Sequence, residues 1–318
     1  MHIAIVGAGM AGLACAEGLA GRGATITVLD KGRGPGGRMS TRRIQTDLGE
    51  ATFDHGAQYF TVRDPGFRTR VEHWITAGCV ARWTALDTEA YVGVPGMNAP
   101  IRQMAQPFDV QWGTQVQSLG PHAEGWRLIT QTGASFDVDA VVVAVPAEQA
   151  AALIAPAMPE LAQWTRATPT APCWTVMLAF AEALPTPLNA LRGTPADALG
   201  WAARNGSKPG RTGPEAWVLQ ATPAWSIRHL EADPEWVAAE LSAALSAQLT
   251  LPLPPPIAGG THRWRYASSG NAGSGAYWDA ERWLGLCGDW LSGPRVEAAW
   301  TSGTLLAEQI AKGFGQAL

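Results

Sequence analysis

The chain has 318 residues, of which 47% are hydrophobic and 16% are charged, and its formal net charge is −4 at pH 7. This composition excludes extensive disorder and supplies enough apolar residues for one large domain or two. No run of basic residues forms a stripe, so we expect no nucleic-acid or membrane partner and favour a small molecule. The four cysteines are scattered without a C-x-x-C motif, which predicts no metal site and a reducing, cytoplasmic location. The oligomeric state stays open.

The apolar segment at residues 2–40 has three interpretations: an export signal, a membrane anchor or a nucleotide-binding unit. Glycines and the charges of Glu17 and Arg22 interrupt the apolar run, which excludes a signal peptide. No window supplies about 20 uncharged apolar residues for a spanning helix. A β-branched run at residues 3–6, followed by apolar residues at helical spacing, instead predicts a strand, a tight turn and a helix.

The predicted turn carries the pattern G-x-G-x-x-G at Gly7, Gly9 and Gly12. The first glycine permits the turn, the second lets a pyrophosphate approach the backbone, and the third lets the helix pack closely on the strand. The start of the helix offers free N–H groups and a positive dipole end to the phosphates. The motif therefore predicts a dinucleotide site.

A second strand is predicted over residues 24–29 and ends at Asp30, whose carboxylate can accept hydrogen bonds from both hydroxyls of an adenosine ribose. A second glycine cluster follows directly, in K-G-R-G-P-G-G-R-M-S-T. Its backbone N–H groups, with the guanidinium groups of Arg33 and Arg38, suit a pyrophosphate. The alternative is a plain surface loop.

Two central segments add to this pattern. The segment D-H-G-A-Q-Y-F at residues 54–60 places Gly56 and Ala57 before an aromatic pair, where a flat ring system can lie against the backbone; a simple strand turn is the alternative. Short strands are predicted at residues 115–120 and 137–146, and we expect both to extend the same sheet.

Near the end of the chain, a buried strand is predicted at residues 284–287, followed by a turn at Gly288 and Asp289 and a helix that begins near Arg295 or Val296. An aspartate at such a turn can bind ribityl hydroxyls. The start of the helix can stabilise negative charge on the pyrimidine end of a reduced flavin. A C-terminal segment with cofactor duties is not typical of a simple NAD dehydrogenase.

Together these segments resemble the glutathione-reductase-type FAD fold that is shared with amine oxidases, and they resemble most closely the bacterial branch of the renalase family. The resemblance rests on six strings in order along the chain, which are DKGRGPGGRMS, DHGAQYFTVRD, GVPGMNA, WAARNGSKPGR, HRWRYA and CGDWLSGPRVEAAWTSG. The strings RNGSKPGR and RWRYA are the more selective. His55 stands where the family pattern has an apolar residue, and SSGNAG after Ala267 also departs from that pattern.

The resemblance implies an α/β fold in which a Rossmann-like FAD-binding domain is interleaved with a substrate domain built on an antiparallel sheet, as in p-hydroxybenzoate hydroxylase and amine oxidases. The FAD-binding domain would take residues 1–66, 96–155 and 262–318. The substrate domain would take residues 67–95 and 156–261. Alternating patterns at residues 174–180 and 217–221 suit an antiparallel sheet with one covered face.

The resemblance also implies noncovalent FAD and no metal. Cys287 lies inside the predicted strand before Gly288, away from the expected place of a flavin tether. The residues expected to bind FAD are Gly7, Gly9, Met10, Ala11, Gly12, Asp30, Lys31, Arg33, Gly37, Arg38, Met39, Gly56, Ala57, Gln58, Tyr59, Val116, Gly288, Asp289, Arg295, Val296 and Glu297.

Renalase-like enzymes oxidise the 2-dihydro and 6-dihydro isomers of NAD(P)H to NAD(P)+ by hydride transfer to flavin N5, and O2 takes the electrons and becomes H2O2. Departure of the hydride generates an aromatic pyridinium, so the site needs positioning more than acid–base groups. The resemblance therefore predicts an FAD-dependent oxidoreductase with a dihydronicotinamide and O2 as partners. We expect the substrate near the catalytic residues Asn205, His262, Arg263 and Trp290. The preference between NAD and NADP isomers stays open.

Amine oxidases of this fold are similar to one another in placing a lysine near flavin N5. The chain has three lysines: Lys31 in the nucleotide turn, Lys312 in the last predicted helix and Lys208 in an S-K-P-G turn. None is where a strand-held lysine over a flavin is expected, which argues against amine oxidation. An amine oxidase, or an FAD-binding protein without oxidase turnover, remains the alternative.

Several side chains keep two interpretations at this stage. His262 is either a substrate contact or an ordinary strand residue, and Trp290 is either a substrate contact or part of the core. The cations Arg204, Lys208 and Arg211 form either a solvated face or a group that attracts the phosphates of the substrate.

Overall fold

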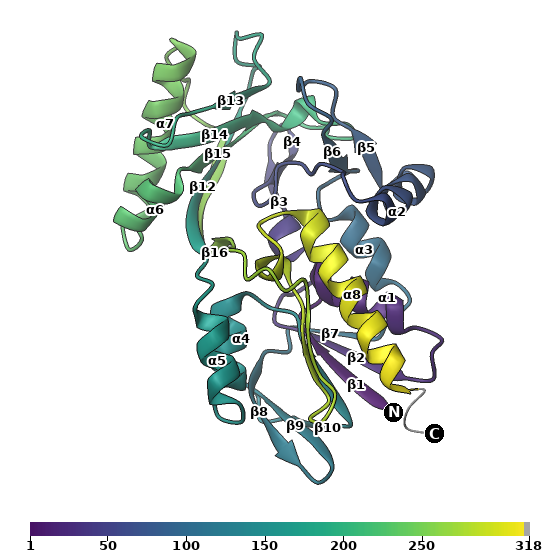
Figure 1. The fold of residues 1–318 in the computed structure, drawn as a ribbon. Coiled ribbons are helices and arrows are strands. Elements are labelled where there is room, and N and C mark those ends of the chain that lie inside the picture. Colours follow the sequence, from purple (N-terminus) through teal and green to yellow (C-terminus); the bar gives the residue numbers. More distant parts are fainter. Residues whose placement is uncertain (315–318) are drawn as a thin grey trace.

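Two sheets of different type organise the chain in the computed structural model, which describes residues 1–314 (Figure 1). Short 3-10 helices are labelled η. In chain order the elements are β1 (His2–Val6), α1 (Met10–Leu19), β2 (Thr25–Asp30), η1 (Gly37–Met39), β3 (Thr41–Thr46), β4 (Gly49–Asp54), α2 (Pro65–Thr76), β5 (Val80–Arg82), β6 (Tyr91–Gly93), α3 (Ala99–Ala105), β7 (Val110–Trp112), β8 (Val116–His122), β9 (Gly125–Thr130), β10 (Ser135–Val138), β11 (Ala140–Val143), α4 (Ala147–Ile154), α5 (Pro159–Arg166), β12 (Ala171–Phe180), β13 (Ala190–Arg192), β14 (Leu199–Arg204), η2 (Asn205–Ser207), β15 (Glu215–Ala221), α6 (Pro223–Arg228), α7 (Pro234–Leu249), β16 (Ala258–Ser268), β17 (Tyr277–Asp279), β18 (Leu284–Leu286), η3 (Asp289–Leu291) and α8 (Val296–Phe314).

The larger sheet has the strand order β17-β18-β11-β1-β2-β7, with parallel pairing throughout except for the edge strand β17. Strand β1 is buried from its second residue onward, because Ile3 and Ile5 pack with α1 and α8 while Ala4 and Val6 pack with α4 on the other face. Burial on both faces is typical of parallel strands covered by helices. The predicted Rossmann-like α/β fold is confirmed.

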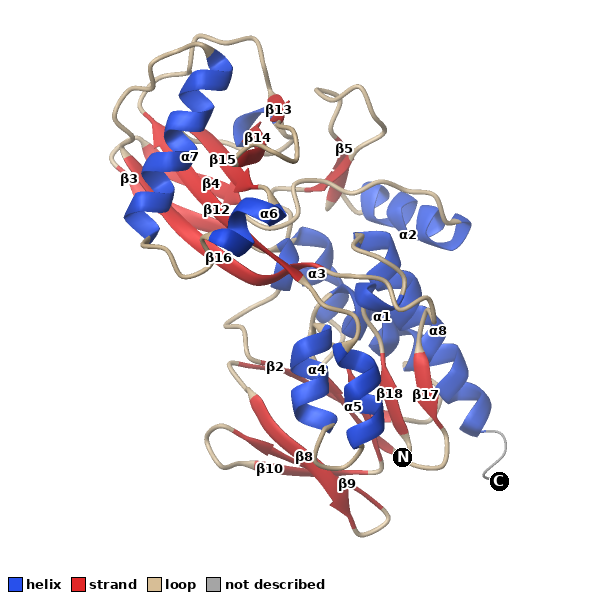
Figure 2. Ribbon diagram, turned by 60° about the vertical axis from the view of Figure 1, so that its left-hand side comes forward, coloured by secondary structure: helices blue, strands red, loops and turns tan. Residues whose placement is uncertain are grey.

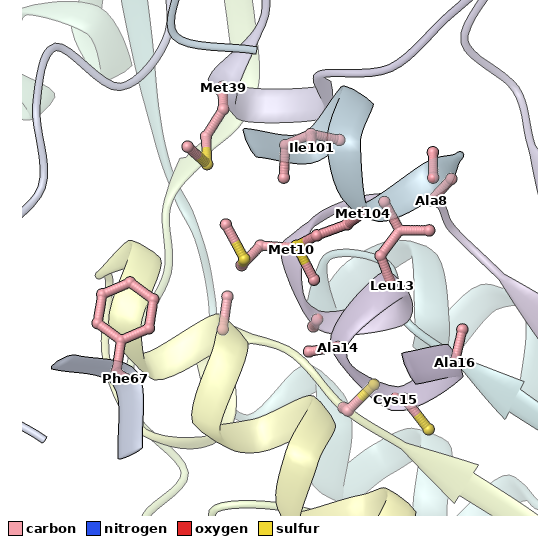
Figure 3. Packing of buried hydrophobic residues seen from close by; sticks show 14 of the residues in the cluster. Ala8, Met10, Leu13, Ala14, Cys15, Ala16, Met39, Phe67, Ile101 and Met104 are labelled. Carbon is pink, nitrogen blue, oxygen red and sulfur yellow. The ribbon is translucent and has the colours of Figure 1, made fainter. Parts of the chain in front are cut away.

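Helices α1 and α8 lie side by side over one face of this sheet (Figure 1). A Cβ atom on Gly303 of α8 would lie 2.1 Å from the carbonyl oxygen of Ala11, so only glycine allows this approach. Figure 3 shows Met10 and Leu13 of α1 beside Met104 of α3 in the same apolar cluster. The start of α1 is therefore fixed by packing on several sides.

The second sheet is antiparallel, with the order β13-β14-β15-β12-β16 (Figure 2). Alternate residues of β12 divide between two apolar clusters. Val176 and Leu178 pack toward α7. Met177 and Ala179 pack against Phe53 of the β3–β4 hairpin. Both faces of the sheet are covered in this region, so the prediction of one covered face is wrong. The hairpin that covers the second face comes from a distant part of the chain, and the local pattern therefore did not predict it.

The strands predicted at residues 115–120 and 137–146 do not both extend the larger sheet. The first is β8, which belongs to a separate sheet of order β10-β9-β8, and only Val116 and Leu119 of its residues are buried. The second divides into β10 and β11, because the chain turns at Asp139, whose N–H donates to the carbonyl of His2 and whose carboxylate accepts from the N–H of His2. Only β11 continues the larger sheet.

The predicted domain boundary at residue 262 falls inside strand β16. Residues on both sides of it, from Ala258 to Ser268, pair with β12 in the antiparallel sheet. The chain therefore leaves this sheet after residue 268 and returns to the larger sheet with β17. The division into two domains stays a prediction.

Two further observations concern residues 1–314. No helix in this range combines the length and the apolar character that crossing a membrane requires. The same residues contain no cluster of three or more His, Cys, Asp or Glu side chains arranged to hold a metal ion.

Replacing Phe53 with alanine should lower the free energy of unfolding by about 3–5 kcal/mol, because the side chain is fully buried between the hairpin and the antiparallel sheet. Leu48, which is 56% exposed in the turn of the same hairpin, provides the control. Its replacement with alanine should change the free energy by less than about 0.5 kcal/mol. Urea denaturation measures both values, and similar effects of the two substitutions would contradict the packing described.

Candidate functional site

Residues of both large sheets line one cavity of about 1880 Å³. Pockets for a single drug-sized ligand measure about 300–1,000 Å³, so this cavity has room for a dinucleotide and a second molecule. Most of the residues predicted to bind a cofactor line it, namely Gly7, Gly9, Met10, Ala11, Asp30, Lys31, Gly37, Arg38, Met39, Gly56, Ala57, Tyr59, Val116, Gly288, Asp289, Arg295 and Val296.

The first glycine motif has the geometry that its sequence predicts. Gly7 adopts a φ of +111°, and a Cβ atom there would lie 2.5 Å from the carbonyl oxygen of Ala144. A Cβ atom on Gly12 would lie 1.9 Å from the carbonyl oxygen of Gly7, so this glycine allows helix and strand to touch. Gly9 has no atom within 4 Å of its Cβ position and opens onto the cavity.

Helix α1 begins directly after Gly9 and has no side-chain cap. The first N–H groups of a helix have no partner inside the helix and carry partial positive charge. Met10 and Ala11, in this first turn, line the cavity. The residues present therefore fit a phosphate group at this point.

Asp30, at the end of β2, accepts hydrogen bonds from the backbone N–H groups of Ala8 (2.7 Å) and Gly32 (2.6 Å). Each carboxylate oxygen keeps further acceptor capacity toward the cavity. Asp30 thus holds two neighbouring turns in place and can still accept from a ribose.

Arg38 and Asp289, which lie at opposite ends of the sequence, form a bidentate ion pair on the cavity wall. The Nη1 and Nη2 atoms of Arg38 lie 2.8 and 2.6 Å from the two carboxylate oxygens, and Ser269 Oγ donates to the same carboxylate at 2.9 Å. Bidentate pairs of this kind fix both orientation and distance. The pair joins the second glycine segment to the turn before α8.

Four of the predicted cofactor residues do not line the cavity: Gly12, Arg33, Gln58 and Glu297. Gln58 is turned inward and donates to the carbonyls of Asp54 and Gly56. Glu297 accepts from the backbone N–H groups of Arg63 and Asp64, both at 2.6 Å. Both side chains support the cavity wall from behind.

Alternate residues of β16 point to opposite faces of the antiparallel sheet, as strand geometry requires. His262 and Trp264 contact His55 on the cavity side, where the indole of Trp264 donates to the His55 carbonyl at 2.8 Å. Arg263 points to the other face, where it donates to the carbonyl of Leu230 at 2.7 Å and pairs with Glu231 at 2.5 Å. His262 and Arg263 therefore point to different faces of the strand, while Arg263 also lines the cavity, and its expected place near the substrate stays a prediction.

The two histidines on the cavity side are neutral at pH 7. Burial, assisted by His262 and Arg42, lowers the pKa of His55 to about 4. Burial also lowers the pKa of His262, and Arg42 adds to the effect. The ring of His55 stacks on Trp264 with a centroid distance of 5.2 Å. His55 behaves as a flat neutral ring, which explains how it occupies a position where an apolar residue is expected.

Asn205 and Trp290, both predicted near the substrate, are fully buried and do not line the cavity. The amide of Asn205 donates to the carbonyl of Thr52 at 2.8 Å, which ties η2 to the hairpin. Trp290 packs in the apolar cluster that includes α4, with its ring against Trp164. For Trp290 the core interpretation holds.

The cations at positions 204, 208 and 211 do not form a solvated face, and none of them lines the large cavity. Lys208 and Arg211 are buried and pair with Asp54 at 3.2 and 2.5 Å, and Arg204 pairs with Glu215 at 2.9 Å. Asp54 is a functional candidate that sequence reasoning missed. No local sequence pattern indicates this role, because the two cations that pair with Asp54 lie more than 150 residues away along the chain.

Replacing Gly9 with valine should abolish flavin binding and leave the apoprotein folded. The backbone there has φ −83° and ψ −173°, which valine adopts without strain, but its side chain would fill the space needed by a pyrophosphate. The ratio of flavin to protein absorbance and a thermal unfolding curve measure the two effects. Gly120→Val is the control, since that site is equally open but lies outside the cavity. Normal flavin content in Gly9→Val would contradict the assignment.

Replacing Asp289 with alanine should weaken flavin binding by roughly 10- to 150-fold, which corresponds to the about 1.5–3 kcal/mol of a charged hydrogen bond. The substitution also releases Arg38 from its partner. Fluorescence titration of the apoprotein with flavin measures the affinity. Ser269→Ala, which removes only a hydroxyl contact to the same carboxylate, should have a smaller effect. Equal affinities for wild type and Asp289→Ala would exclude a cofactor role for Asp289.

Solved structures of several oxidases have the same fold as this chain. Cyclohexylamine oxidase from Brevibacterium oxydans superposes with a TM-score of 0.77 at 14% identity, covering 99% of both chains. A proposed protoporphyrinogen oxidase from Exiguobacterium gives 0.77 at 13% identity, covering 98% of this chain and 99% of the other. Putrescine oxidase with bound putrescine gives 0.67 at 13% identity, covering 98% and 99%.

Comparison of sequences gives a local relative and two family matches. An L-amino-acid oxidase from Daboia russelii is 57% identical over 42 residues, which cover 13% of this chain and only 8% of that protein. Residues 5–74 match the NAD(P)-binding Rossmann-like domain, and residues 75–311 match the flavin containing amine oxidoreductase family. The second match spans more than half of the chain, and the chain therefore belongs to the family of flavin-containing amine oxidoreductases.

Proposed function

We propose that the protein is an FAD-dependent oxidase of the renalase type, which oxidises 2-dihydro and 6-dihydro isomers of NAD(P)H to NAD(P)+ and reduces O2 to H2O2. The observation that carries the proposal is the chemistry of the sheet face toward the cavity. The register of β12, β15 and β16 brings Cys173, Gln220, His262 and Trp264 together on this face. Among the described residues, this face carries no lysine and no carboxylate, and its histidine is neutral.

The cavity wall fits FAD held without a covalent bond. Gly9 and the start of α1 would hold the pyrophosphate, Asp30 the adenosine ribose and Asp289 the ribityl chain, while the start of α8 would face the pyrimidine end of the ring. Cys173 is the one cysteine among the described residues on the cavity wall, and burial raises its pKa to about 11. A thiol kept protonated is a poor nucleophile for a flavin tether.

The bound flavin would accept a hydride and pass the electrons to O2. A dihydropyridine becomes an aromatic pyridinium when its hydride leaves, so the protein has no proton to remove from it. What the residues must supply is orientation, and Tyr59, Phe60 and Trp264 offer flat surfaces on the cavity wall for a nicotinamide ring. A neutral aromatic wall is enough for this reaction.

Amine oxidation is the second candidate, and the family supports it, as do the amine-oxidising enzymes among the structures of the same fold. The position of Lys208 argues against amine oxidation. The ammonium group is buried against Asp54 and Gln58 and does not reach the cavity. Lys31 lines the cavity on the nucleotide side, next to Asp30, and Lys312 is in α8.

The two candidates are separated by mixing the FAD-loaded protein with each substrate class without oxygen. The 2-dihydro and 6-dihydro isomers of NAD(P)H should bleach the flavin absorbance within seconds, and readmitted air should restore it and yield H2O2. Common monoamines and polyamines should leave the absorbance unchanged. Ordinary 1,4-NAD(P)H should react at least about 100-fold more slowly, because a misplacement of about 1 Å already costs that much. Bleaching by an amine alone would establish the amine-oxidase alternative.

A further inference from the structure

Three charged side chains outside the cavity are completely enclosed by protein. Asp54 ends β4, and Lys208 and Arg211 follow η2. Their side chains are 0%, 0% and 1% exposed, and both cations pair with the single carboxylate. The cluster therefore carries one net positive charge in the interior of the protein.

Stability alone does not account for such a cluster. Removing charges from water is costly, and well-packed apolar side chains of similar volume often give equal or greater stability. Apolar neighbours are at hand, because Lys208 lies over the ring of Trp83 at 5.4 Å from its centroid. The contacts of the cluster indicate a functional reason for its charge.

The cluster holds the turn that forms part of the cavity wall. Lys208 Nζ donates to Gln58 Oε1 at 3.1 Å, and Gln58 in turn donates to the carbonyl of Gly56 at 3.2 Å. Gln220 of β15 donates to the same carbonyl at 2.7 Å. Gly56 and Ala57 line the cavity, with the ammonium group on the other side of this turn.

We propose that Lys208 is a positioning residue for the flavin, and that with Arg211 and Asp54 it holds the turn at residues 56–58 and places one net positive charge behind it. This charge stabilises the negative charge that the flavin gains on reduction, and so raises its reduction potential. The inference rests on the proposed location of the flavin ring against Gly56 and Ala57. It does not depend on which substrate supplies the hydride.

The charge can act on a flavin ring at this turn because charges inside a protein are screened weakly. At low effective permittivity, a cation acts over several ångströms on a group that lies in the same dry region. Asp54 reduces the field of the cluster but cannot cancel two cations. The neutral ring of His55 adds no charge on the cavity side.

The charge of Lys208 changes within an accessible pH range. Burial lowers its pKa to about 8, although Asp54 raises it, and Arg211 lowers it further. Asp54 and Arg211 are the charged groups around Lys208. The other partners of Lys208, which are Gln58, Asn205 and the ring of Trp83, are neutral. The positive charge is present at pH 7 and is lost as the pH rises through about 8.

Lys208→Met tests the proposal in the flavin-loaded protein. The variant should have a lower flavin midpoint potential than wild type in a dye-coupled reductive titration at pH 7, and Lys208→Arg should restore most of the difference. Thr41→Val is the matched control, since it removes a neutral hydrogen bond to Asp54 at 2.8 Å and keeps all three charges. It should lower the unfolding temperature without moving the potential.

A second measurement uses wild type alone and stays decisive if Lys208→Met does not fold. The wild-type potential should fall more steeply with pH between about 7 and 10 than it does below pH 7, because Lys208 then takes up a proton with reduction. If Lys208→Met folds and its potential equals that of wild type, the proposal is overturned. If the variant does not fold, a wild-type potential without this steepening overturns it. Neither readout uses a dihydronicotinamide, so failure of the proposed substrate is observed separately.

Discussion

Asp54 is a fully buried carboxylate on which three separate parts of the chain converge. It accepts hydrogen bonds from Thr41 Oγ1 in β3 at 2.8 Å and from the backbone N–H of Met97 at 2.9 Å, besides pairing with the two cations after η2. Burial raises its pKa, but Lys208 and Arg211 outweigh this and lower the pKa to about 2. Because the folded pKa lies below the unfolded value, the resulting stability is present above about pH 4 and is lost as the pH falls toward 2. At neutral pH the carboxylate therefore holds the hairpin, the loop before α3 and the segment after η2 in one arrangement.

The two sheets contribute different chemistry to the cavity. The parallel sheet presents the ends of β1 and β2, where Gly9 and Asp30 offer backbone N–H groups and a carboxylate. Ligands in such sheets are bound beyond the carboxyl ends of the strands. The antiparallel sheet presents a flat wall in which His262 and Trp264 carry no charge, since burial keeps the histidine neutral. The parallel sheet thus supplies groups for phosphate and ribose recognition, and the antiparallel sheet supplies flat neutral rings, beside which Arg263 and Arg265 also line the cavity.

The sequence predicted those features that depend on neighbouring residues. The spacing of Gly7, Gly9 and Gly12 defines their roles, because turn, open approach and close packing all occur within six residues. The sequence did not predict features that depend on contacts between distant parts of the chain. The face on which Arg263 lies follows from the register of β16 on β12, and the two cations that pair with Asp54 lie more than 150 residues away. The place of β8 in a separate sheet likewise follows from its pairing with β9, and only Val116 and Leu119 of β8 are buried.

The pairing of Arg38 with Asp289 has a consequence for biosynthesis. The glycine motif near residue 9 and the turn at residue 289 line one cavity, yet a ribosome makes them roughly 280 residues apart. At the usual 5–20 residues per second, the later segment follows the earlier by roughly 15 to 60 s. Strands β1, β2, β7 and β11 can pair during that interval, but the wall formed by β18 and α8 is still missing. The nascent chain thus passes through a stage in which the nucleotide half is formed and open on one side, and the cofactor can be enclosed only after the last strand has joined.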